Sequence, residues 1–138
     1  MSPVSETSLE SKPWAKKRKP TIDASELFDR TPPHHIDAER SLLGSILLDP
    51  MVLTEIVEII SRPDQFYKEA HGTIFSCLLE TFEAHQTGDM VQLAESLRAK
   101  GVFDQVGGSS YLMELAEAVP SAANAPYYAK LIADSYRL

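Results

Sequence analysis

The chain has 138 residues, 43% of them hydrophobic, and a formal net charge of −7, which fits a single globular domain of ordinary size. Its longest apolar runs span only a few residues and the N-terminus has no apolar core, so we expect neither a membrane-spanning segment nor a signal peptide. The single cysteine, Cys77, has no partner for a disulfide, and the default expectation is a soluble cytoplasmic protein.

Residues 1–30 differ in composition from the rest of the chain. They mix Ser, Pro, Lys and Glu with few apolar side chains, so we predict a disordered tail. Within it, KPWAKKRKP (residues 12–20) places four consecutive cations near Trp14, a combination that can contact nucleic acid through charge and stacking. A solubilising tail is the favoured interpretation. The remaining 108 residues hold seven basic and fifteen acidic side chains, a poor match for phosphate-backbone binding, so the expected main partner is another protein.

Helical patterns begin after Pro32 and Pro33. The first predicted helix covers residues 36–49, where leucines and isoleucines lie on one side and Asp37 and Glu39 occupy the first turn. Gly44 inside this helix indicates a neighbouring helix at close range. A second helix is predicted from Pro50 up to Pro63, with Asp49 as its cap.

Residues 66–85 form the longest apolar pattern, and we expect them to provide the central helix, with Phe66 inserted into the core. Asp89 and Gln92 have the spacing of a capping box before a helix that Gly101 ends. A further helix is predicted from Ser109 or Ser110 until Pro120, and a last one from Pro126 onward. No stretch alternates with period two, so the predicted fold is all-α, a compact bundle of about six helices.

The motifs of catalysis and metal binding are not found. Gly107 to Ser110 lacks the lysine of a phosphate-binding loop, and His34, His35, His71 and His85 have no metal-ligand spacing with Cys77. For a histidine here, burial with a satisfied hydrogen bond is the favoured interpretation, and Cys77 is expected to be an inert core thiol. No catalytic residue, cofactor site or metal site is predicted.

Four segments resemble one family, in order and spacing. PPHHIDAERSLLGSILLD (32–49), FYKEAHGTIF (66–75), LAESLRAKG (93–101) and GGSSYLMELAEAVPSAANAPYYAKLI (107–132) resemble the N-terminal domain of bacterial replicative DNA helicases of the DnaB type. The resemblance covers residues 31–138, and PSAAN is its most specific part. The sequence departs from the family at residues 133–135, where a basic-acidic-basic run is more usual.

The resemblance implies a division of labour. In this family a separate RecA-like motor domain binds ATP and Mg and drives DNA through a hexameric ring, while the N-terminal domains pair into a collar that receives primase and regulates loading. The chain would then consist of a tail (1–30) and a helical head (31–138), with hairpin, linker and motor outside it. The expected partners are other helicase protomers and primase, with a helicase loader as a further candidate, and DNA would be contacted mainly through the motor. The head itself would hydrolyse no ATP and would be a monomer or weak dimer.

The candidate interface residues are exposed positions of the central and last helices: Tyr67, Glu80, Glu83, Tyr128 and Tyr136. Each has an alternative interpretation, because the tyrosines can cover the core and the glutamates can be merely solvated. Two other classes of function stay open. The chain could be a stand-alone helical DNA-binding or adaptor module that uses the basic tail, or a small α-helical enzyme.

Overall fold

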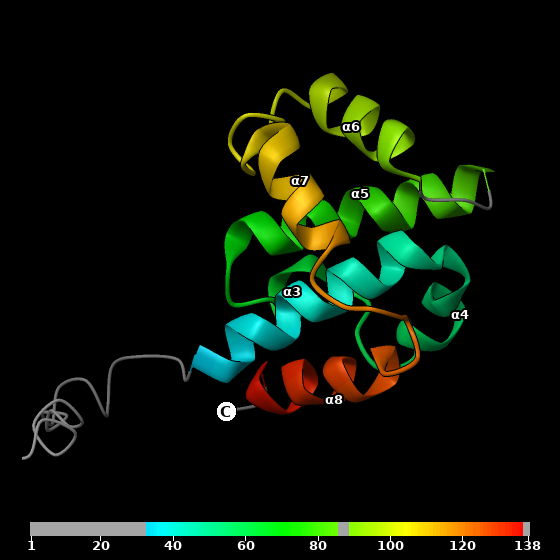
Figure 1. Cartoon of the computed structure of the whole chain (residues 1–138), viewed down its shortest axis with the longest axis vertical. Coiled ribbons are helices and arrows are strands. Elements are labelled where there is room, and N and C mark those ends of the chain that lie inside the picture. Colours follow the sequence, from blue (N-terminus) through cyan, green and yellow to red (C-terminus); the bar gives the residue numbers. More distant parts are fainter. Residues whose placement is uncertain (1–32, 86–88, 137–138) are drawn as a thin grey trace, which may run out of the picture. The chain divides into compact units, whose positions relative to one another are not determined.

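The computed structural model describes residues 33–85 and 89–136, so the predicted tail lies outside the described residues. Figure 1 shows the arrangement of the helices. The elements are α3 (Pro33–Leu48), η1 (Pro50–Val52), α4 (Leu53–Ile56), η2 (Pro63–Gln65), α5 (Glu69–His85), α6 (Met90–Ala99), α7 (Gly108–Ala116) and α8 (Ala125–Tyr136), where η marks a 3-10 helix. These six α-helices, with no strand in the described ranges, confirm the all-α prediction.

Helix α3 has the central position. It contacts α5, α7, α8 and η1, whereas α5 contacts α3, α6 and η2 (Figure 1). The prediction that residues 66–85 form the central helix is therefore wrong. The physical reason is the small pair Gly44 and Ser45, which are fully covered by neighbouring elements but add little to the hydrophobic pattern of the sequence.

Gly44 is the point of closest approach between α3 and α7. A Cβ atom at this position would collide with the backbone carbonyl oxygen of Leu115 and would lie 3.3 Å from the Cβ of Ala118. The side chain of any other residue would push α7 away. The close helix neighbour that was predicted for Gly44 is confirmed and is α7.

The core is one cluster to which every long helix contributes. Phe66 is buried in it, as predicted, with its ring centroid 5.0 Å from that of Phe75, and Cys77 is a fully buried free thiol. The largest fully buried side chains are Phe75, Leu42, Leu43, Ile46, Leu53, Ile56, Ile60, Ile74, Leu78, Leu93, Leu97 and Leu112. No helix in the described part of the chain is long and apolar enough to cross a membrane.

The segment between Pro50 and Pro63 is less helical than predicted. Asp49 caps it as expected, accepting a hydrogen bond from the amide of Met51 at 3.2 Å, but the helix is a 3-10 turn followed by the four-residue α4. After Ile56 the backbone tightens, since the amide of Ile59 bonds to the carbonyl of Ile56 at 2.8 Å. The side-chain Oε1 of Gln65 accepts the amides of Ser61 and Arg62 at 3.1 Å each. These local bonds replace the helical ones that the pattern predicted.

The later helices follow the sequence signals closely. The side chain of Asp89 accepts a hydrogen bond from the amide of Gln92 at 2.9 Å, which confirms Asp89 as the N-terminal cap of α6. The second half of the predicted capping box is not formed, because the buried Gln92 Oε1 has no hydrogen-bond partner among the described residues. Gly101 has φ +73°, the left-handed conformation that ends a helix. Helix α7 begins one residue before the predicted start, at Gly108, and Pro126 lies in the first turn of α8.

Candidate functional site

A pocket of about 330 Å³ lies between α3, α8 and the segment around η2. It contains two of the five predicted interface residues, Tyr67 and Tyr136, and we call it the tyrosine pocket. Its lining residues are His35, Glu39, Asp64, Gln65, Phe66, Tyr67, Ile132, Ser135 and Tyr136. Segments that are far apart in the sequence therefore meet in one hollow, with apolar side chains at its base and tyrosines at its edge.

One side of the pocket is closed by a cluster around Arg62. The guanidinium Nη2 donates to the Tyr136 hydroxyl at 2.7 Å, and Nε lies 3.2 Å from the Asp64 carboxylate. The Arg62 Cζ atom is 5.5 Å from the Tyr136 ring centroid, within cation-π range. Tyr67, which also lines the pocket, is 64% exposed. The lining thus contains one tyrosine that is held by an arginine and one whose ring is exposed.

The backbone of Tyr67 is held by a buried carboxylate. Glu39, only 2% exposed, accepts the amide of Tyr67 at 2.6 Å through Oε2 and the amide of Lys68 at 3.3 Å through Oε1. Both amides lie just before the first turn of α5, where a negative charge is favourable. The expectation that Asp37 and Glu39 occupy the first turn of their own helix is wrong for both residues, because α3 already begins at Pro33.

Glu39 also belongs to a chain of buried hydrogen bonds that joins three helices. Its Oε1 is 2.7 Å from His71 Nδ1, and His71 Nε2 is 2.6 Å from the Tyr111 hydroxyl. Both ring nitrogens of His71 therefore have a hydrogen-bond partner, and so do the Glu39 carboxyl group and the Tyr111 hydroxyl. His71 is therefore a buried, hydrogen-bonded histidine, which agrees with the favoured interpretation of the sequence.

Tyr111 closes this chain near the surface. Its ring stacks almost parallel to His71, with centroids 5.9 Å apart, and the Lys68 ammonium lies 4.9 Å from its ring centroid. Partial burial raises the pKa of Tyr111 above its ordinary value. We call Glu39, His71 and Tyr111 the buried triad.

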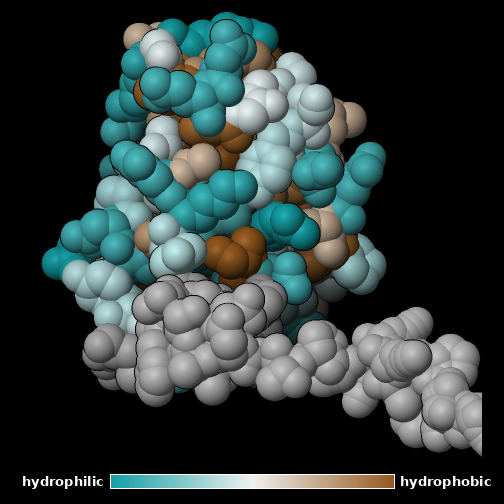
Figure 2. Space-filling view, turned by 90° about the vertical axis from the view of Figure 1, so that its left-hand side faces the viewer, coloured by the Kyte–Doolittle hydropathy of each residue, from teal (hydrophilic) through white to brown (hydrophobic). Residues whose placement is uncertain are grey.

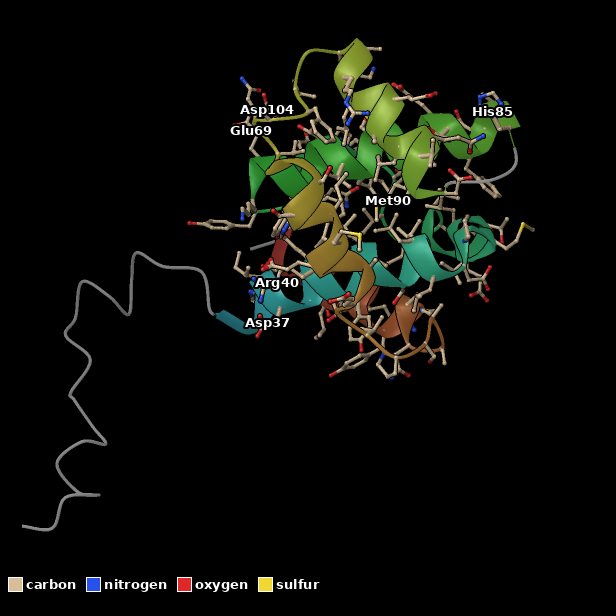
Figure 3. The ribbon with its side chains drawn as sticks, turned by 45° about the horizontal axis from the view of Figure 1, so that its top comes forward. Asp37, Arg40, Glu69, His85, Met90 and Asp104 are labelled. Atoms are coloured by element: carbon tan, nitrogen blue, oxygen red, sulfur yellow. The ribbon has the colours of Figure 1, made fainter. Side chains whose placement is uncertain are left out.

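The other predicted interface residues lie elsewhere. Glu80 on α5 pairs with Lys100 at 3.0 Å, and this hydrogen bond raises the pKa of Lys100. Glu83 is exposed on the same helix, toward the end marked by His85 in Figure 3, away from Glu69. Tyr128 is half-buried against the core, beside the exposed Tyr127 at 5.9 Å between centroids. The structure brings together Tyr67 and Tyr136 but not the other three.

Sequence reasoning missed Glu39, Arg62 and Asp64 as parts of this site. For Glu39 a signal existed, because it precedes Leu42 and Leu43 by three and four residues and so shares their buried face. His71 has the same relation to Ile74 and Phe75. For Arg62 and Asp64 no such pattern is visible, since both are exposed and the bond from Arg62 to Tyr136 depends on where α8 ends.

The tyrosine pocket combines exposed aromatic side chains with a guanidinium at its edge. Among the described residues no three His, Cys, Asp or Glu side chains are grouped to hold a metal ion. On the face in Figure 2 hydrophobic residues appear in separate small areas between hydrophilic ones. Exposed tyrosines and an arginine around a small hollow are the side chains that most often carry binding energy in protein interfaces.

A model of the DnaB-like helicase N-terminal domain matches residues 31–134. The chain belongs to this family. The DnaB-type resemblance seen in the sequence is thereby confirmed. Similar proteins include the replicative DNA helicase DnaB of Treponema pallidum, 43% identical over 110 residues, and that of Geobacillus stearothermophilus, 43% identical over 109 residues. These alignments cover 80% and 78% of this chain but 25% and 24% of the two helicases, so the chain spans about a quarter of the length of these curated relatives.

A solved structure agrees with this assignment. The crystal structure of the N-terminal domain of DnaB helicase from Mycobacterium tuberculosis superposes with a TM-score of 0.72 at 35% sequence identity, covering 77% of this chain and 73% of that one. The DnaB-like N-terminal fold therefore includes the helices that form the tyrosine pocket and the buried triad in this chain.

Proposed function

We propose that this chain is the N-terminal head of a replicative DNA helicase and acts as a protein-docking module. The observation that carries the proposal is the family match over residues 31–134 together with relatives that are replicative DNA helicases. In the proposal the head pairs with the heads of other protomers in a hexamer and receives primase at the replication fork. A helicase loader is a further partner of the same kind.

The proposal places the chemistry outside this chain. The parent protein would be an ATP-dependent DNA helicase, and its ATP, Mg and most of its DNA contacts would belong to the motor domain. The match to only about a quarter of each relative supports this division. The tyrosine pocket is the docking face that the geometry favours, because two candidate residues meet there beside an arginine.

Calorimetric titration of the 138-residue chain with purified primase of the same organism tests the proposal. We expect saturable binding, and a chain in which Tyr67 and Tyr136 are both leucine should bind more weakly. The matched control is Tyr127→Leu, which removes another exposed tyrosine of α8 outside the pocket. Absence of binding to primase, together with sedimentation as a strict monomer at high concentration, would contradict a docking role.

A second candidate function is favoured by the basic run at residues 16–19 beside Trp14, which suits single-stranded DNA. Fluorescence anisotropy with a labelled oligonucleotide would detect it. Binding that falls steeply with salt and disappears on deletion of residues 1–30 would assign it to the tail. Salt-insensitive binding by the head alone would contradict that assignment.

A further inference from the structure

The tyrosine pocket carries an excess of negative charge. Among its lining residues Glu39 and Asp64 are acidic and none is Lys or Arg. Arg62 on the edge pairs with Asp64, and the buried Glu39 already accepts the amides of Tyr67 and Lys68 and contacts His71 Nδ1. The lining nevertheless contains two carboxylates and no Lys or Arg. The surrounding head is acidic as well, with fifteen acidic against seven basic side chains in residues 31–138. An incoming acidic group would be repelled here, and a cation would be attracted.

The pocket edge already binds one guanidinium. Arg62 combines an ion pair with Asp64, a hydrogen bond to the Tyr136 hydroxyl and a position 5.5 Å from the Tyr136 ring centroid. This internal arginine demonstrates which chemistry the edge accepts, a planar cation between a carboxylate and an aromatic ring. Tyr67 provides a second tyrosine ring in the lining of the same pocket.

The ring of Tyr67 is available for such a contact. Its side chain is 64% exposed, and within the described ranges no stacking or cation-π contact to it is present. Its backbone is fixed by the 2.6 Å bond from its amide to Glu39. Because the backbone of Tyr67 is already ordered, this chain loses less conformational entropy when a partner stacks on the ring.

We propose that the tyrosine pocket receives an arginine or lysine side chain of a partner protein, stacked on Tyr67 and facing the exposed carboxylate of Asp64, with the buried charge of Glu39 behind it. This inference rests on the proposed docking function and adds the charge and identity of the group that docks. A hollow of about 330 Å³ has room for a long side chain but is small beside a whole protein interface, so the contact is one anchor within a larger interface.

The test uses the isotope-labelled 138-residue chain and three blocked tripeptides, acetyl-Gly-Arg-Gly-amide and its Gln and Glu counterparts. We expect the arginine peptide to give saturable NMR shifts at the amides of Gln65, Tyr67 and Ser135, and the Gln and Glu peptides to give at least threefold weaker binding at the same signals. The exposed Glu80 and Glu83 serve as an internal control for unspecific attraction. Equal shifts around these glutamates, or equal binding of the three peptides, would overturn the proposal.

Two substitutions separate the ring from the charge. Tyr67→Leu keeps an apolar side chain but removes the aromatic face, and Asp64→Asn removes one carboxylate at nearly equal size. Each should weaken the arginine peptide about threefold, whereas Tyr127→Leu should leave it unchanged. All three positions are exposed, so unchanged melting temperatures are expected and would exclude unfolding as the cause. Unaltered peptide affinity in both pocket variants refutes the inference.

The same variants distinguish this inference from the docking function itself. If primase binds the unaltered chain and binds Tyr67→Leu and Asp64→Asn equally well, the head docks its partner but the cation anchor is wrong. If the arginine peptide binds the pocket with the expected preference but neither primase nor a second head binds, the anchor is correct and the proposed function fails.

Discussion

The buried triad and the Arg62 cluster have nearly the same geometry and opposite surroundings. Each joins three polar side chains, with distances of 2.6–2.7 Å in the triad and 2.7–3.2 Å in the cluster. Glu39 and His71 are buried, whereas the side chains of Arg62 and Asp64 are 56% and 68% exposed. Breaking a buried charged contact leaves groups that water cannot reach, while water replaces a lost partner at the surface. Short distances therefore do not show which cluster holds the fold together.

The largest expected effect is at His71. His71→Leu keeps the volume but leaves Glu39 with only its two amide partners and the Tyr111 hydroxyl with none from the triad. We expect the free energy of unfolding to fall by about 3 kcal/mol. Urea denaturation measures this. His85→Leu, at the exposed end of α5, is the matched control and should change stability by less than about 0.5 kcal/mol. Equal losses in the two variants would contradict a special role for the triad.

A steric contact between the same helices is expected to come next. Gly44→Ala places a Cβ against the Leu115 carbonyl oxygen, a backbone atom that cannot move without shifting α7. Although alanine favours helices by about 1 kcal/mol over glycine, we expect a net loss of about 2 kcal/mol from overpacking. Thermal unfolding measures this loss. A stabilised Gly44→Ala variant would mean that α7 can separate from α3 at little cost.

The hydroxyl of Tyr111 gives a smaller effect that depends on pH. Tyr111→Phe removes the hydrogen bond to His71 and should cost about 1 kcal/mol at neutral pH. Because burial raises the pKa of Tyr111, the unfolded chain loses its proton first, so this tyrosine contributes less stability as pH rises above about 10. The stability difference between the two proteins should therefore shrink from pH 8 to pH 11. A difference that stays constant or grows would contradict the assigned burial.

The sequence predicted the helices well wherever local chemistry sets the ends. The Asp89 cap and the left-handed Gly101 are examples, since both depend only on neighbouring residues. Prediction failed for residues 50–63, where the pattern from Val52 to Ile60 indicated one helix. There the chain instead turns so that both Ile60 and Phe66 reach the core, and Gln65 supplies the hydrogen bonds of the turn. Long-range packing determines the conformation of residues 50–63, and no pattern in the local sequence predicts it.

The candidate site was predictable only in part. Tyr67 and Tyr136 were named as interface candidates once the family resemblance had suggested a docking role, and the structure places them in one pocket, although whether they bind a partner stays a prediction. The buried triad depends on contacts over 32 and 40 residues, which a single sequence does not reveal. The central role of α3 was missed because Gly44 and Ser45 are buried through their small size rather than through hydrophobicity.

The smallest effect on stability is expected at Arg62, and it sharpens the comparison with the triad most directly. Arg62→Gln removes the ion pair to Asp64 and the bond to Tyr136. Because water reaches all three residues, which are 46% to 68% exposed, the free energy of unfolding should change by about 0.5 kcal/mol or less. Binding should respond instead, because the substitution frees the carboxylate of Asp64 and the ring of Tyr136 for an external cation. We expect the arginine tripeptide to bind this variant more tightly than the unaltered chain, as measured by the same NMR titration. A strong loss of stability with unchanged peptide binding would place Arg62 with the triad, as part of the framework of the fold rather than of its contact surface.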